Sequence, residues 1–122
     1  MKLVAFKKVR AVFYRTEQGT EPVRDFLRGL PREDRRVIGN DIATIEYGWP
    51  VGKPTCAPLG LGLWEVRSTL TTNRIARVLF MLDGGQMVLL HGFIKKTQKT
   101  PQGDIDTARK RMKEVKRHEQ NT

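Results

Sequence analysis

Two arginines and two lysines stand at positions of this chain where they could bind phosphate groups. Arg67 and Arg77 each interrupt an apolar segment, and Lys95 and Lys96 follow a third one. A guanidinium group is a planar donor that matches phosphate oxygens, and an ammonium group adds a point charge. We therefore expect the four side chains to converge on a phosphate-binding concavity. A structural ion pair across the sheet, such as Glu65 with Arg77, is the alternative, because an unpaired arginine is costly to bury.

Other reactive side chains are few. His91 lies near the end of the third apolar segment, where it could act as a general acid or base or have a structural role. The single cysteine, Cys56, has no neighbouring histidine that would make it a nucleophile. The sequence contains no metal-ligand spacing, no P-loop and no GxGxxG motif. We therefore expect any nuclease chemistry here to use neither a metal nor another cofactor.

The charge balance indicates a polyanionic partner. The chain has 23 Lys and Arg against 13 Asp and Glu, a net charge of +10. Such a surface attracts nucleic acid, an anionic membrane or an acidic protein. Much of the excess lies between Lys95 and Arg117, at a strand end and in a helix without an exposed aromatic stripe. This placement favours nucleic acid over a membrane, although a solvated helix face would also explain the helical part.

Length and composition predict one domain over residues 1–122. A chain of 122 residues with 39% hydrophobic side chains can bury one core. The N-terminus lacks the apolar run of a signal peptide, and no segment has the ~20 apolar residues that span a bilayer. A single cysteine fits a reducing compartment. We expect a soluble, cytoplasmic domain.

The periodicity of apolar residues predicts an α+β fold with the order β-α-α-β-β-β-α. The expected strands cover 9–15, 63–68, 74–82 and 87–94, and a two-helix hairpin covers 20–29 and 31–48. Segment 49–62 is rich in Gly and Pro and is predicted to be a loop. A basic amphipathic helix closes the chain, with Asp104 as its N-cap; Thr20 is the expected N-cap of the first helix. We expect the helices to cover one face of an antiparallel sheet and to leave the other face free to bind.

Several segments resemble one toxin family. The segments are LWEVRS, RIARVLF, LLHGFIKKTQKTP and DTARKRM, together with GTEPVRDFLRGLP upstream. They resemble the phage Gp49-like branch of HigB toxins, within the RelE/ParE toxin superfamily, and the likeness covers roughly residues 9–115. The run from Phe93 to Pro101 is its most specific part.

The resemblance implies a fold, an activity and partners. Members are compact RelE-like domains in which two helices pack on an antiparallel sheet, and they are toxins of type II toxin–antitoxin pairs. The HigB and RelE branches cut mRNA on the translating ribosome with basic residues in place of a metal, whereas the ParE branch poisons DNA gyrase. HigB-type toxins are held inactive by an antitoxin (HigA-like) with a helix-turn-helix domain. The expected partners are therefore this antitoxin, the ribosome and mRNA.

The resemblance also carries over individual residues. Arg67 matches the arginine of the LWE-x-R strand, Arg77 matches that of the next strand, and Lys95 and Lys96 match the paired lysines after the last strand. The chain departs from the family in lacking a tyrosine near that strand's end and a terminal His/Asp/Tyr group. Basic residues outside this cluster are expected to contact RNA: Lys53, which corresponds loosely to a basic residue in the preceding loop, and Lys99, Arg109, Lys110 and Lys113.

These residues suggest a metal-free cleavage in which a ribose 2′-OH attacks its adjacent phosphate. Lys95 or Lys96 would be the general base, Arg67 and Arg77 would stabilise the charged phosphate, and His91 is a candidate acid. A non-enzymatic toxin or binder acting on DNA gyrase or nucleic acid is the alternative, because it needs the same basic surface. A phage protein that kept the fold without the activity is a third possibility.

Overall fold

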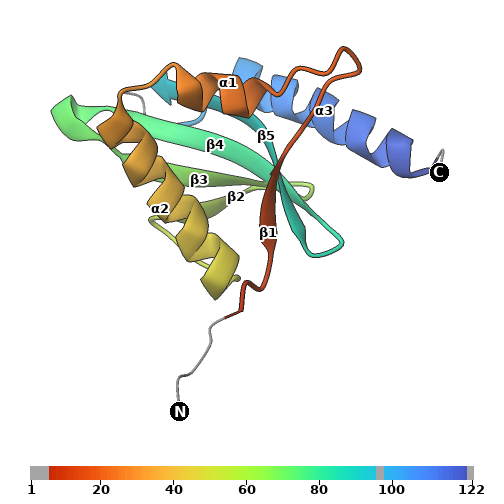
Figure 1. Cartoon of the computed structure of the whole chain (residues 1–122), viewed down its shortest axis with the longest axis horizontal. Helices are drawn as coiled ribbons and strands as arrows, with labels where there is room; N and C mark the ends of the chain where they lie inside the picture. Colours follow the sequence, from red (N-terminus) through yellow and green to blue (C-terminus); the bar gives the residue numbers. More distant parts are fainter. Residues whose placement is uncertain (1–5, 96–97, 121–122) are drawn as a thin grey trace.

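The computed structural model describes residues 6–95 and 98–120, so the predicted site residue Lys96 lies outside the described residues. Within them it has three α-helices, a short 3-10 helix at Thr71–Asn73 and five strands (Figure 1). The strands are β1 (Arg10–Phe13), β2 (Cys56–Gly60), β3 (Leu63–Thr69), β4 (Ile75–Asp83) and β5 (Gln86–Lys95). The helices are α1 (Pro22–Arg28), α2 (Arg32–Gly48) and α3 (Gln102–Gln120). The α+β class and the C-terminal helix are confirmed.

The sheet is mixed, so the prediction of a purely antiparallel sheet is wrong. Its strand order is β1-β5-β4-β3-β2, with β1 parallel to β5 and every other pair antiparallel. The additional strand, β2, lies inside the segment predicted to be a loop. Pro58 belongs to this strand and faces Trp64 across the ladder. An edge strand tolerates a proline because one side of it has no strand to bond.

Helices cover both faces of the sheet, so the expectation of a free face is also wrong. On one face α1 and α2 contribute Val23, Ile38, Ile42 and Ile45 to a core with Val66, Val78 and Phe80. On the other face α3 contributes Ala108 and Met112, which pack with Leu63, Leu79 and Met81. The apolar stripe of α3 needs a surface to bury it, and this second face of the sheet provides one.

A β-bulge in β5 decides which of its side chains lie beneath α3. Leu79 pairs with His91 and the next residue of β4, Phe80, pairs with Leu89, so Leu90 is the extra residue of the bulge. Leu90 is buried in the α3-side core, and Phe93 joins the same core. The bulge shifts the alternation by one residue. It thereby places the odd-numbered residues from His91 to Lys95 on the face that α3 covers.

Two helix starts differ from the predictions. Glu21, not Thr20, is the N-cap of α1, and Pro22 occupies its first turn. The hydroxyl of Thr20 lies 2.7 Å from that of Thr16. Helix α3 begins at Gln102, so Asp104 lies within its first turn and is not its N-cap. In the described part of the chain, no helix has the length and apolarity needed to cross a membrane.

Candidate active site

Three of the four predicted phosphate-binding residues lie at one end of the sheet, where β3 ends, β4 begins and β5 ends. Arg67 and Arg77 are directly opposite each other in the antiparallel ladder, so their side chains share the α3 face. Lys95 is paired with Ile75, two residues before Arg77 on β4. The register of three strands thus brings together residues that are up to 28 positions apart in the sequence.

A buried ion network lies beneath this end of the sheet. Arg77 is fully buried, and its Nε is 3.8 Å from the Glu65 carboxylate, whose side chain is 7% exposed. Arg67 reaches the same carboxylate at 3.9 Å but keeps 29% of its side chain exposed. Burial, and then the neighbouring Arg67, lower the pKa of Arg77 from its ordinary value. The alternative of a structural pair between Glu65 and Arg77 is therefore realised, and Glu65 compensates two guanidinium groups.

The same network holds the segment that follows β5. Arg77 Nη2 donates to the carbonyl oxygen of Gln98 at 3.0 Å, and Arg67 Nη2 donates to it at 3.4 Å. The hydroxyl of Thr100 donates to the Glu65 carboxylate. In this arrangement Arg77 has no exposed surface with which to touch a phosphate. Instead Arg77 holds Gln98 and Glu65 holds Thr100, which fixes this segment against the sheet. Sequence reasoning did not identify Gln98 or Thr100, since a carbonyl and a hydroxyl in a loop carry no recognisable pattern.

Above the network, the surface of this end is cationic. Lys95 has 49% of its side chain exposed, and Lys99 is exposed on the segment held by the network. Lys53 is exposed in the loop that precedes β2. That loop is attached here, because Thr55, two residues later, accepts a 2.8 Å hydrogen bond from the backbone of Arg67. Such a group of cations can neutralise a phosphodiester and hold it against the sheet.

His91 is joined to α3 through both of its ring nitrogens. Nε2 lies 2.7 Å from Asp104 Oδ1, and Arg111 Nη1 donates to Nδ1 at 3.3 Å and to the carbonyl of Leu90 at 2.8 Å. Because a guanidinium only donates, this arrangement assigns the Nε2–H tautomer. Asp104 also pairs with Lys95 at 3.5 Å, so one carboxylate joins the histidine to the exposed lysine. The predicted role of His91 as an acid stays a prediction, and it requires one of these contacts to open.

The remaining predicted RNA-binding residues lie along α3, away from the sheet-end cluster. Arg109 donates to the carbonyls of Leu59 and Gly60 at 3.1 and 3.3 Å, which ties α3 to the β2–β3 hairpin at the opposite end of β3. Lys113 is exposed one turn further along the helix. The structure therefore places Arg109 and Lys113 at the end of the sheet opposite to Lys53 and Lys99.

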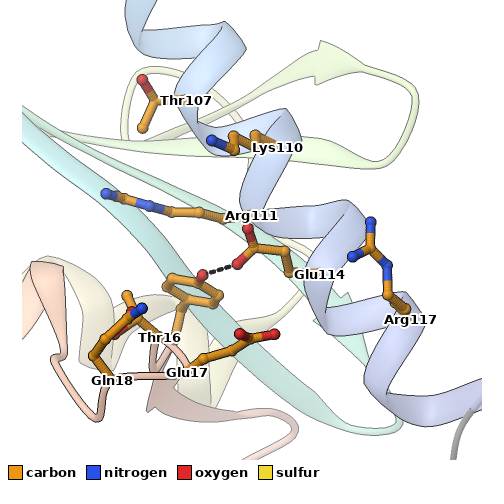
Figure 2. Close-up of a pocket in the computed structure, with 9 residues that line it drawn as sticks. Thr16, Glu17, Gln18, Thr107, Lys110, Arg111, Glu114 and Arg117 are labelled. Carbon is orange, nitrogen blue, oxygen red and sulfur yellow. Dashed lines mark hydrogen bonds between the residues drawn. The ribbon is translucent and has the colours of Figure 1, made fainter.

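Lys110 borders a hollow of about 540 Å³ between α3 and the segment after β1. Figure 2 shows Lys110, Arg111 and Glu114 of α3 facing Glu17 and neighbouring residues of that segment. At its base the hydroxyl of Tyr14 donates to Glu114. Burial and this hydrogen bond raise the pKa of Tyr14 to about 12. A tyrosine held neutral in this way anchors α3 to the sheet.

Sequence reasoning gave Asp104 a capping role and assigned none to Arg111. An acidic residue within a basic segment was the available signal for Asp104, but its partner His91 is 13 residues away and is brought near by the packing of α3. Among the described residues, no group of three or more His, Cys, Asp or Glu side chains is placed to hold a metal ion.

One comparison with known proteins assigns a family to this chain. Residues 25–113 match the family of phage-derived Gp49-like proteins, a stretch that runs from α1 into α3 and includes the whole sheet-end cluster. The chain belongs to this family, which is a family of RelE/HigB-like toxins. A search of curated proteins gave no match.

Proposed function

We propose that this protein is the toxin of a type II toxin–antitoxin pair and that it cuts mRNA on the translating ribosome. One observation carries the proposal: the partly exposed Arg67 of β3, the exposed Lys95 of β5 and the exposed Lys99 of the following segment gather at one end of the sheet, over a buried Glu65–Arg77 frame. The membership in a RelE/HigB-like toxin family supports a toxin-like role.

The proposed chemistry is an attack by the ribose 2′-oxygen on the adjacent phosphorus. The 2′-OH proton leaves, a 2′,3′-cyclic phosphate forms, and the 5′-oxygen departs with a proton. Arg67, which is partly exposed, and Lys95, which is exposed, contact the phosphate and stabilise the charge of the transition state, which is commonly the largest contribution in such reactions. Lys95 also transfers a proton, a role that sequence reasoning gives equally to Lys96. Arg77 acts as a positioning residue, because it holds Gln98 from beneath.

Positioning by the ribosome would supply much of the rate. General acid–base catalysis contributes only about 10²–10⁴-fold, whereas correct orientation of the reacting groups contributes more. We therefore expect the isolated protein to cut free RNA poorly and to cut mRNA during translation.

The test is induction of the wild-type gene and of Arg67→Ala and Lys95→Ala in a bacterial host, with growth and transcript integrity measured. Arg10→Ala is the matched control, since Arg10 is an exposed arginine of β1 that pairs with Gln86, at the opposite end of β5 from Lys95. Wild type and the control are expected to stop growth and fragment transcripts, and the two site variants to do neither while remaining folded. Unchanged toxicity in both site variants would contradict the assignment.

The order of events separates the alternative activities. Fragmented transcripts with an early stop in translation support the proposed nuclease. An early stop in DNA replication with intact transcripts would instead indicate a toxin that acts on gyrase. The proposed restraint is an antitoxin with a helix-turn-helix domain, and co-expression of the adjacent gene should restore growth.

A further inference from the structure

A hollow of about 410 Å³, lined by both polar and apolar side chains, adjoins the sheet-end cluster. Strand β2 begins at Cys56, opposite Val66, so the last residues of β3 extend past it and leave an edge beside α2. The hollow is lined there by Asp41 of α2 and by Arg67, with Thr55 and Thr69 nearby and Val37 and Ile75 as apolar parts. Arg67 belongs to both features, so the hollow lies next to the surface proposed to hold a phosphate.

Asp41 is the acceptor of this hollow. It is half-buried, and among the described residues its carboxylate has no hydrogen-bond or ion-pair partner. The other acids near the cluster are engaged: Glu65 with two arginines and Thr100, and Asp104 with His91 and Lys95. A carboxylate left unpartnered in a hollow that also has a guanidinium and apolar walls suits a flat ligand with a donor edge and an attached anion.

We propose that this hollow binds an RNA base and that Asp41 selects guanine, an inference that rests on the proposed RNA-cutting function. Single-stranded RNA is read on the Watson–Crick edges of its bases. The edge of guanine has two adjacent donors, N1–H and the N2 amino group, which match the two oxygens of a carboxylate. Adenine, cytosine and uracil each set a ring or carbonyl acceptor beside a single donor, and the carboxylate repels that acceptor. Arg67 would hold the phosphate of the nucleotide whose base Asp41 reads.

The first test maps the 5′ ends of transcripts after induction of wild type, Asp41→Asn and the control Asp25→Asn. Asp25 is an exposed acid of α1 outside the hollow, so its variant makes the same charge change elsewhere. Wild type and the control should share an enrichment of guanine at one fixed position relative to the cut. Asp41→Asn should still cut, but its guanine enrichment should be about tenfold lower, which is the discrimination expected of one bidentate contact. Unchanged guanine enrichment in Asp41→Asn, or no fixed-position enrichment in wild type, would overturn the proposal.

The second test does not depend on cleavage. Guanosine monophosphate and inosine monophosphate are each titrated into the purified protein while backbone amide signals are followed by NMR. Inosine lacks the N2 amino group, so wild type should bind it several-fold more weakly, with shifts at Thr55 and Thr69, and Asp41→Asn should bind both nucleotides alike. Equal binding by wild type would overturn the base site. Absence of transcript cleavage together with a guanosine preference would instead overturn the proposed nuclease and leave the base site standing.

Discussion

The buried pair of Glu65 and Arg77 gives a sharp test of how the candidate site is built. Glu65→Gln is close in shape to the native residue and keeps an oxygen that can accept from Thr100, so it removes mainly the negative charge. Arg77 is fully buried 3.8 Å from that carboxylate, and Arg67 is 3.9 Å from it. The variant would leave two guanidinium groups beside each other without their shared carboxylate.

Glu65→Gln should cause a large loss of unfolding free energy for a substitution that changes so few atoms. Unit charges about 4 Å apart interact by about 4 kcal/mol at an effective dielectric constant of about 20. Removing one partner of a buried ion pair costs about 3–5 kcal/mol, because the other charge stays buried. Glu65→Gln should therefore lower the free energy of unfolding by about 3 kcal/mol. Arg77→Met removes the most deeply buried charge. The double variant Glu65→Gln/Arg77→Met should therefore lose less unfolding free energy than the two single variants together, with a coupling of about 1–3 kcal/mol.

Urea unfolding followed by circular dichroism measures all four proteins of this cycle. The exposed pair Glu33 and Arg36, in which each side chain is 61% exposed, is the matched control, and its Gln and Met variants should leave the unfolding midpoint unchanged. Additive losses in the double variant would refute the reasoning, and so would a Glu65→Gln protein as stable as wild type. Either result would mean that the carboxylate does not compensate the buried guanidinium.

Three further predictions concern the rest of the fold. Gly92→Ala should destabilise the protein by about 1–3 kcal/mol in urea unfolding, because a Cβ there would lie 2.5 Å from the ring of Phe26; an unchanged midpoint would contradict the packing of α1 on β5. The pKa of Tyr14 is raised to about 12, so the contribution of its neutral hydroxyl to the stability of the fold is complete below pH 10 and is lost as the pH rises through 12. An absorbance titration should show one tyrosine that ionises at unusually high pH, and Glu114→Ala should lower the pKa of that tyrosine. Burial raises the pKa of the Cys56 thiol to about 11, so it should resist iodoacetamide at pH 8 in the native protein and react once unfolded.

Local sequence patterns were sufficient for most elements and insufficient for their long-range pairing. The apolar periodicity predicted α1, α2, α3 and strands β3 to β5, because each has a continuous stripe of its own period. It could not predict that β1 pairs in parallel with β5, since strands more than 70 residues apart have no connecting turn that signals their pairing. The segment containing Pro58 was predicted to be a loop, and it becomes strand β2 by pairing with β3.

The candidate site shows the same division. The same-face placement of Arg67 and Arg77 follows from the register of one hairpin, and the pair of Glu65 with Arg77 was foreseen as the structural alternative. The full burial of Arg77 was not predicted, because burial beneath α3 depends on where that helix packs on the sheet. The face of His91 depends on a one-residue bulge at Leu90, and bulges leave little trace in a single sequence.

The positive charge of this protein serves structure and surface in different places. At the sheet end, the innermost cation, Arg77, is compensated by Glu65 and fixes the segment after β5. Arg67 pairs with Glu65 and stays partly exposed, and Lys95 pairs with Asp104 and stays exposed. A phosphate arriving there would meet cations already positioned by the buried Glu65 and the partly buried Asp104, and little reorganisation would be needed at the moment of reaction. The cations near the β2–β3 hairpin, such as Lys113, lie at the other end of the sheet, and in the proposed function they would hold RNA by its backbone alone. In the proposed function, substitution of Arg67 or Lys95 should therefore lower the rate of RNA cleavage. Substitution of a cation near the β2–β3 hairpin should instead lower the affinity for RNA and its dependence on salt.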